Sequence, residues 1–123
     1  MKKILILILL FNFSNATASE FVTNFNKEAF LQAQDKGKTV VVYSWNKYCL
    51  TCNKQKAILK QAKNDFHDVI FYYIEHTKNK STVNDLKISF WSTIVVYKNN
   101  KEISKAVGLT DKKEIYSLIK KGI

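Results

Sequence analysis

The chain has 123 residues and a formal net charge of +10, and 46% of its residues are hydrophobic. This length is sufficient for one compact domain with a modest core and too short for two. All of the basic residues are lysines, and they are scattered rather than grouped in a stripe. Because base and phosphate recognition relies on the arginine fork, nucleic acid is not an expected partner. A basic surface still favours acidic partners or an anionic membrane face.

The first 18 residues have the pattern of a secretory signal peptide. Lys2 and Lys3 give a positive start, residues 4–11 are continuously apolar, and Ala16-Thr17-Ala18 supplies small residues for cleavage after Ala18. A membrane anchor is the alternative, but it needs about 20 apolar residues, and Asn12 interrupts the run. The pattern predicts a periplasmic or secreted bacterial protein whose single domain covers residues 19–123 with a charge of +8, since two lysines are removed.

The first half of this domain predicts a βαβ unit. Residues 20–23 can form a short edge strand, and Asn26 is suited to cap a helix that runs to Lys36 before Gly37. Residues 39–44 are apolar or β-branched at nearly every position, which is typical of a strand covered on both faces. A helix follows from about Cys49 to Asn64, then a second buried strand over residues 69–74. The two strands are expected to be parallel, with a right-handed crossover.

The predicted second helix is amphipathic. Apolar residues at helical spacing are expected to face the core: Ile58, Leu59, Ala62 and Phe66. Lysines between them are expected to face water: Lys54, Lys56, Lys60 and Lys63.

The second half predicts a ββα unit. A short helical turn over residues 81–86 precedes a strand over 93–98, a turn at Asn99-Asn100 and a strand over 102–107. Strands joined by so short a turn pair antiparallel. Asp111, three residues before Glu114, is suited to cap the last helix. The predicted fold class is therefore α/β, with a mixed central sheet flanked by helices.

The two cysteines, Cys49 and Cys52, are predicted to lie where a buried strand gives way to a helix. A thiol at the first turn of a helix meets unpaired N–H groups and the positive end of the helix dipole, which lower the pKa of the thiol. The pair is therefore interpreted as a redox dithiol. A structural disulfide or two inert thiols are the alternatives, although a bridge across so short a loop restricts the unfolded chain little.

With this predicted order of strands and helices around the cysteine pair, the chain resembles the thioredoxin superfamily over nearly all of residues 19–123. The resemblance rests on the strand, tryptophan and Cys-x-x-Cys run over residues 40–52, on the strand over 92–99, and on Gly108 before the last helix. It implies a thioredoxin-like βαβαβαββα fold. Leu50-Thr51, between the cysteines, is similar to the exported reductase domain at the C-terminal end of DsbD-type proteins.

The resemblance also implies roles for individual residues. Cys49 would be the nucleophile and Cys52 the resolving thiol of a redox-active disulfide, which exchanges with protein thiols and disulfides. Residues expected to bind substrate are Trp45, Tyr48, Trp91 and Ser92. We expect a monomer that needs no metal or other cofactor. Such a dithiol reduces proteins if a membrane electron donor recharges it and otherwise inserts disulfides, and the similarity at Leu50-Thr51 favours the reductase.

Two positions depart from the family pattern. Tyr43 stands where a buried Asp commonly helps to move a proton, and Ser92 stands where a cis-proline normally opens the strand. Proton transfer would then need water, another side chain or the phenol. A cis bond before a non-proline residue costs about 2.5–4 kcal/mol, so we expect a trans peptide bond at Ser92.

Two other function classes remain open. A metal or cluster module would need four sulfur ligands from two copies of the chain, since His67 and His76 lack zinc-finger spacing. A redox-inactive binding protein or chaperone on the same fold is favoured by the substitutions at Tyr43 and Ser92. Metal content distinguishes the first class, and the function of a variant lacking both cysteines distinguishes the second.

Overall fold

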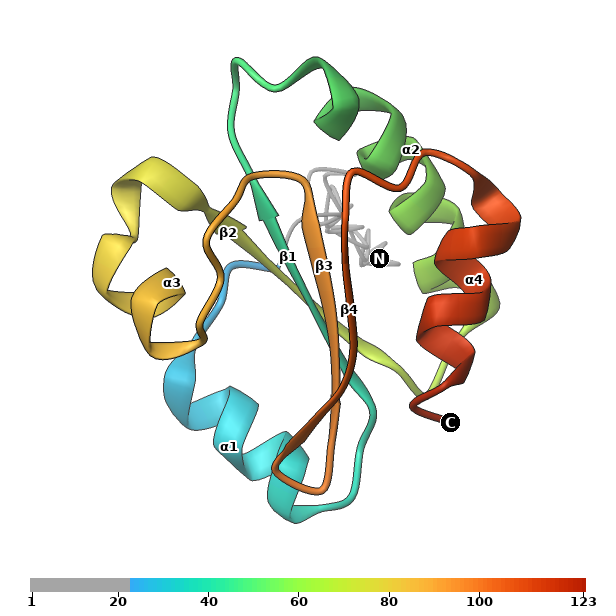
Figure 1. Ribbon diagram of the computed structural model, residues 1–123. Helices are drawn as coiled ribbons and strands as arrows, with labels where there is room; N and C mark the ends of the chain where they lie inside the picture. Colours follow the sequence, from blue (N-terminus) through green and yellow to red (C-terminus); the bar gives the residue numbers. More distant parts are fainter. Residues whose placement is uncertain (1–22) are drawn as a thin grey trace, which may run out of the picture.

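The computed structural model describes residues 23–123 (Figure 1). The predicted signal peptide and its cleavage site lie outside these residues. The elements, in chain order, are α1 Lys27–Asp35, β1 Val40–Trp45, α2 Leu50–Asp65, β2 Ile70–Glu75, the 3₁₀ turn η1 His76–Lys78, α3 Lys80–Asp85, β3 Thr93–Lys98, β4 Lys101–Val107 and α4 Lys112–Lys120.

The four strands form one mixed sheet in the order β2-β1-β3-β4. β1 pairs parallel with β2 and antiparallel with β3, and β3 pairs antiparallel with β4. Both central strands are almost completely buried, which explains why their sequences are apolar at consecutive positions. The predicted α/β class, the parallel crossover and the antiparallel hairpin are confirmed.

Helices cover both faces of the sheet, with α1 and α3 on one side and α2 and α4 on the other (Figure 1). Alternate residues of β1 point to opposite faces, so Val41 and Tyr43 pack against α2 and α4 while Val40 and Val42 pack against α1. The face under α2 and α4 includes Cys52 in its buried cluster. One of the two cysteines is therefore part of the core.

Most ends of the helices and strands lie within one residue of the positions predicted from local sequence signals. The side chain of Asn26 accepts a hydrogen bond from Ala29 N–H, and that of Asp111 accepts one from Glu114 N–H, so both predicted N-caps are confirmed. Asn99 and Asn100 both have positive φ, as a tight hairpin turn requires. β1, β2 and α2 are each displaced by one residue from their predicted bounds.

The predicted edge strand lies mostly outside the described residues. Within them, Asn24 forms a parallel bridge with Tyr73, and Tyr73 N–H donates to Thr23 O over 2.9 Å. The chain therefore runs beside β2 before α1 begins.

The C-terminal residues pack against the start of β1. Gly122 is buried, and the Thr39 hydroxyl donates a hydrogen bond to its carbonyl. A Cβ at Gly122 would lie 2.5 Å from Val96 Cγ1 and 2.9 Å from Thr39 Cγ2, so only glycine fits this contact. Within residues 23–123, no helix is long and apolar enough to cross a membrane.

Candidate redox site

The two cysteines lie at the start of α2 and form a disulfide. Cys49 is the N-cap residue, and its Sγ accepts a hydrogen bond from Cys52 N–H over 3.2 Å. This N–H is one of the donors that a helix leaves unpaired at its first turn. The capped sulfur predicted from the sequence is therefore present, and a thiolate at Cys49 would be stabilised by the same N–H and by the helix dipole.

The two sulfurs differ in exposure. Cys49 is half-buried at the surface end of the helix, whereas Cys52 is fully buried. A substrate disulfide can therefore reach Cys49 but not Cys52. This difference agrees with the predicted order in which the two thiols react.

Asn46 fixes the loop that joins β1 to Cys49. Its side chain is buried, donates to Glu75 Oε1 over 2.8 Å and accepts from Tyr48 N–H over 2.9 Å. The backbone carbonyl of Asn46 accepts a hydrogen bond from Cys49 N–H over 3.1 Å. Burial opposes ionisation of Glu75, but hydrogen bonds from Thr77, Asn46 and backbone N–H groups outweigh it and lower the pKa of Glu75. The end of β2 therefore holds the cysteine loop through a carboxylate.

Tyr43 lies beneath the pair, at the position where the family commonly has an Asp. Its hydroxyl donates to Cys52 O over 3.2 Å, and its ring packs edge-on against Tyr73, its register partner on β2. Burial raises the pKa of Tyr43 far above its ordinary value. The phenol therefore stays protonated near neutral pH, where it holds the backbone of Cys52 and does not act as a base.

Replacing Tyr43 with Phe is expected to leave the pH profile of disulfide reduction unchanged, because the phenol does not titrate in the working range. The lost hydrogen bond should lower the free energy of unfolding by about 1 kcal/mol. Urea unfolding and the pH dependence of the rate measure these two effects.

Tyr97→Phe is the matched control for this variant, because no partner for the buried hydroxyl of Tyr97 is found among residues 23–123. A displaced pH profile in Tyr43→Phe, but not in Tyr97→Phe, would mean that the phenol takes part in proton transfer.

Ser92, at the position of the family proline, adopts an unusual backbone conformation. No peptide bond in residues 23–123 is cis, so the expected trans geometry is confirmed. Ser92 instead has φ of +53°, in the left-handed region that non-glycine residues seldom occupy. Its carbonyl accepts from Gly108 N–H over 2.9 Å and from Gln55 Nε2 over 3.1 Å. The segment entering β3 is thus attached to α2 and to the end of β4.

Four large apolar side chains are exposed on the two segments that meet at the start of α2, the cysteine loop and the segment entering β3. The apolar rim, as we call it, comprises Tyr48 (74% exposed), Leu50 (84%), Phe90 (62%) and Trp91 (38%). Tyr48 and Leu50 flank Cys49 in sequence, and the other two precede Ser92. Of the residues predicted to bind substrate, Tyr48 therefore lies on the cysteine loop, and Trp91 and Ser92 lie on the segment that Gln55 connects to α2.

Trp45, the fourth predicted substrate-binding residue, is half-buried. Lys56 Nζ lies 3.5 Å from the centroid of its indole ring. The prediction that Lys56 faces water is wrong in this respect, because a cation gains from contact with an aromatic face. Burial at this contact lowers the pKa of Lys56.

Several residues of this site were not predicted from the sequence. Gln55 and Asn46 are buried polar residues, and Phe90 and Leu50 extend the rim. Gln55 had a signal, because it shares the spacing of Leu59 and Ala62 on the buried side of α2. A polar residue on an otherwise apolar stripe indicates a specific hydrogen bond.

Metal binding within a single chain finds no support in the part of the chain that the structure describes. There, no group of three or more His, Cys, Asp or Glu side chains could hold a metal ion.

Comparisons with known proteins agree with the geometry. The family model for thioredoxin matches residues 21–121. A solved Trxlp structure from Edwardsiella tarda is 23% identical with a TM-score of 0.76, and the match covers 80% of this chain and 97% of that one. Schistosoma mansoni thioredoxin is 25% identical with a TM-score of 0.70, covering 83% and 93%. Oxidised thioredoxin O2 from Arabidopsis thaliana is 20% identical with a TM-score of 0.67, covering 76% and 82%. A search of curated proteins found no match.

The family match extends over almost all of the described residues and includes the cysteine pair. A thioredoxin domain with a disulfide-linked Cys-x-x-Cys motif supports the assignment as a thiol-disulfide oxidoreductase. The chain belongs to the thioredoxin family.

Proposed function

We propose that this protein is an exported reductase of protein disulfides, similar in role to the C-terminal domain of DsbD-type proteins. The observation that carries the proposal is the position of Cys49, which is partly exposed and whose Sγ accepts a hydrogen bond from Cys52 N–H. A thiol held there is nucleophilic in its anionic form.

The reaction transfers two electrons from the dithiol to a substrate disulfide. The Cys49 thiolate attacks one substrate sulfur, forms a mixed disulfide and releases the other substrate sulfur as a thiolate. Cys52, as its thiolate, then attacks Cys49 Sγ and releases the second substrate sulfur. The protein is left with the Cys49–Cys52 disulfide, and the two released thiolates take up the protons that the dithiol loses.

The apolar rim is proposed to bind the chain on either side of the substrate cysteine. Tyr48 and Trp91 supply exposed aromatic surface on opposite segments of the site. The backbone at Trp91 and Ser92 would pair with an extended substrate, and the half-buried Trp45 would add apolar surface for it. These are the roles that the family resemblance implies for the four residues.

Export and recharging belong to the same proposal. The signal-peptide pattern over residues 1–18 supports a periplasmic or secreted location in a bacterium. There, a reductase needs a source of electrons across the membrane, so we propose a membrane protein as electron donor. The protein would act as a monomer, because one chain supplies both cysteines.

The reduction potential tests the direction of electron flow. We expect a value of about −270 mV, typical of a thioredoxin-like reductant, with insulin reduced when dithiothreitol is supplied. Equilibration with glutathione redox buffers measures the potential. A value near −120 mV would indicate a protein that inserts disulfides and would overturn the reductase assignment.

A binding protein without redox chemistry is the second candidate, and the exposure of the rim favours it. In that case, a variant with serine at both Cys49 and Cys52 would keep its function. The proposed reductase would lose it.

A further inference from the structure

Gln55 connects three segments of the redox site. It lies three residues after Cys52 on α2 and is fully buried. Its Nε2 donates to Ser92 O over 3.1 Å and to Leu109 O over 2.9 Å. Both partners are carbonyl oxygens, so the nitrogen rather than the oxygen of the amide must face them. One side chain thus joins α2 to the segment entering β3 and to the segment leaving β4, which lie at the same end of the sheet (Figure 1).

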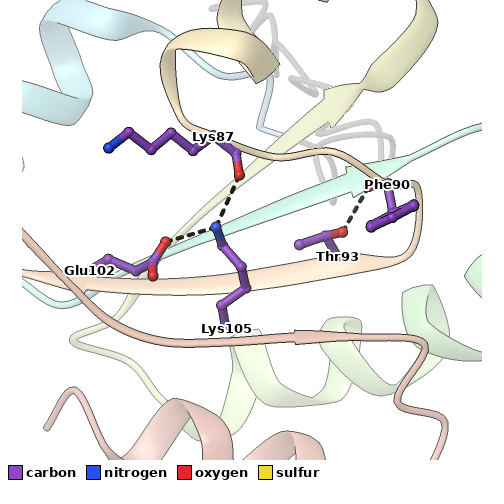
Figure 2. Close-up of polar contacts among 5 residues, drawn as sticks. All are labelled: Lys87, Phe90, Thr93, Glu102 and Lys105. Atoms are coloured by element: carbon purple, nitrogen blue, oxygen red, sulfur yellow. Dashed lines mark hydrogen bonds and ion pairs between the residues drawn. The ribbon is translucent and has the colours of Figure 1, made fainter.

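The segment entering β3, residues 87–92, is held at several points along its length. At its start, Lys105 Nζ donates to Lys87 O over 3.0 Å and pairs with Glu102 over 2.9 Å (Figure 2). Near its end, Thr93 Oγ1 donates to Phe90 O over 2.7 Å (Figure 2). These contacts connect the segment to β3 and β4.

The contact with Gln55 differs from these because it connects the segment to the helix that carries the cysteines. It is made at Ser92, where φ is +53°. A non-glycine residue keeps such a backbone only when its surroundings hold it there. The hydrogen bonds from Gln55 and Gly108 to Ser92 O supply that restraint.

The held segment carries Phe90 and Trp91, which form half of the apolar rim. The other half, Tyr48 and Leu50, flanks Cys49. The spacing between the halves therefore depends on how residues 87–92 are attached to α2. We propose that Gln55 is a positioning residue for protein substrates, which sets the place of Phe90 and Trp91 relative to Cys49. This inference rests on the proposed function.

An apolar side chain of similar size cannot replace this contact. In Gln55→Met, Leu109 O loses the donor that Gln55 supplies, and Ser92 O keeps only the hydrogen bond from Gly108 N–H. A lost partner is costly for a partly buried acceptor. We expect the backbone around Ser92 to move until its carbonyl finds water. The disulfide should be affected little, because its own hydrogen bond comes from Cys52 N–H.

The experiment compares a protein substrate with a small disulfide that does not need the rim. For Gln55→Met we expect KM for insulin to rise about five- to tenfold, with kcat within about twofold of wild type. The rate with the small disulfide 5,5′-dithiobis(2-nitrobenzoate) should stay within about twofold of wild type.

Gln34→Met is the matched control. Gln34 is also buried, but its Oε1 accepts from Asn100 N–H over 2.8 Å, at the β3–β4 turn. That turn lies at the opposite end of the sheet from the disulfide. Both kinetic constants of this variant should match those of wild type.

An unchanged KM for insulin in a folded Gln55→Met variant would overturn the inference, as would an equal loss with both substrates. Neither result would affect the proposed function, which is tested separately by the reduction potential of the wild-type protein and by its activity on the two substrates. If the variant does not fold, the Gln55 side-chain amide signal in the NMR spectrum of wild type decides. Slow exchange of its protons with solvent is expected, and exchange as fast as that of an exposed Gln would overturn the inference.

Discussion

Replacing Cys49 with serine is expected to lower the rate of insulin reduction by at least about a hundredfold, to the background of dithiothreitol alone. A serine hydroxyl stays protonated at neutral pH, so the hydrogen bond from Cys52 N–H has no anion to stabilise. The remaining thiol, Cys52, is buried and cannot reach a protein disulfide. A turbidity assay of insulin reduction measures the effect.

The control for this variant is its thermal unfolding compared with that of reduced wild type, which should agree within a few degrees, because the half-buried Cys49 contributes little to the core. Full reductase activity in a folded Cys49→Ser variant would remove the chemical basis of the proposed mechanism.

Replacing Cys52 with serine is expected to stop the reaction after its first step. Cys49 still attacks the substrate, but no second thiol resolves the mixed disulfide, so a covalent one-to-one complex should accumulate. Non-reducing electrophoresis detects the complex, and dithiothreitol should separate its two components by reducing the mixed disulfide. Applied to a periplasmic extract, the same variant would identify natural substrates by mass spectrometry.

Cys49→Ser serves as the matched control here, because it keeps only the buried thiol and should trap nothing. Complexes formed by Cys49→Ser and not by Cys52→Ser would reverse the two roles. The geometry argues against that outcome, since only Cys49 is accessible at the surface.

Most of the fold could be predicted because its signals are local. β3 occupies the residues predicted for it, and Asn26 and Asp111 cap their helices as expected. The cysteine pair could likewise be placed at a helix start, because an apolar strand precedes it and a lysine-rich helical pattern follows it. Such patterns depend on neighbours within a few residues.

The supports of the site could not be predicted in the same way, because their partners are distant in sequence. Gln55 bonds to Leu109, Asn46 to Glu75, and Lys56 lies over Trp45. No local pattern distinguishes a lysine that covers an indole ring from one that faces water. The left-handed backbone of Ser92 is likewise set by tertiary contacts, since serine has no local preference for it.

The packing of Gly122 against Thr39 and Val96 fixes where the C-terminus leaves the domain. Thr39 lies just before β1 and Cys49 just after it, and a six-residue strand is about 20 Å long. A purification tag or a surface tether joined after Ile123 would therefore be attached at the end of the sheet that is remote from the two sulfurs. Immobilised through that end, the protein would present its reactive edge outward to the solution.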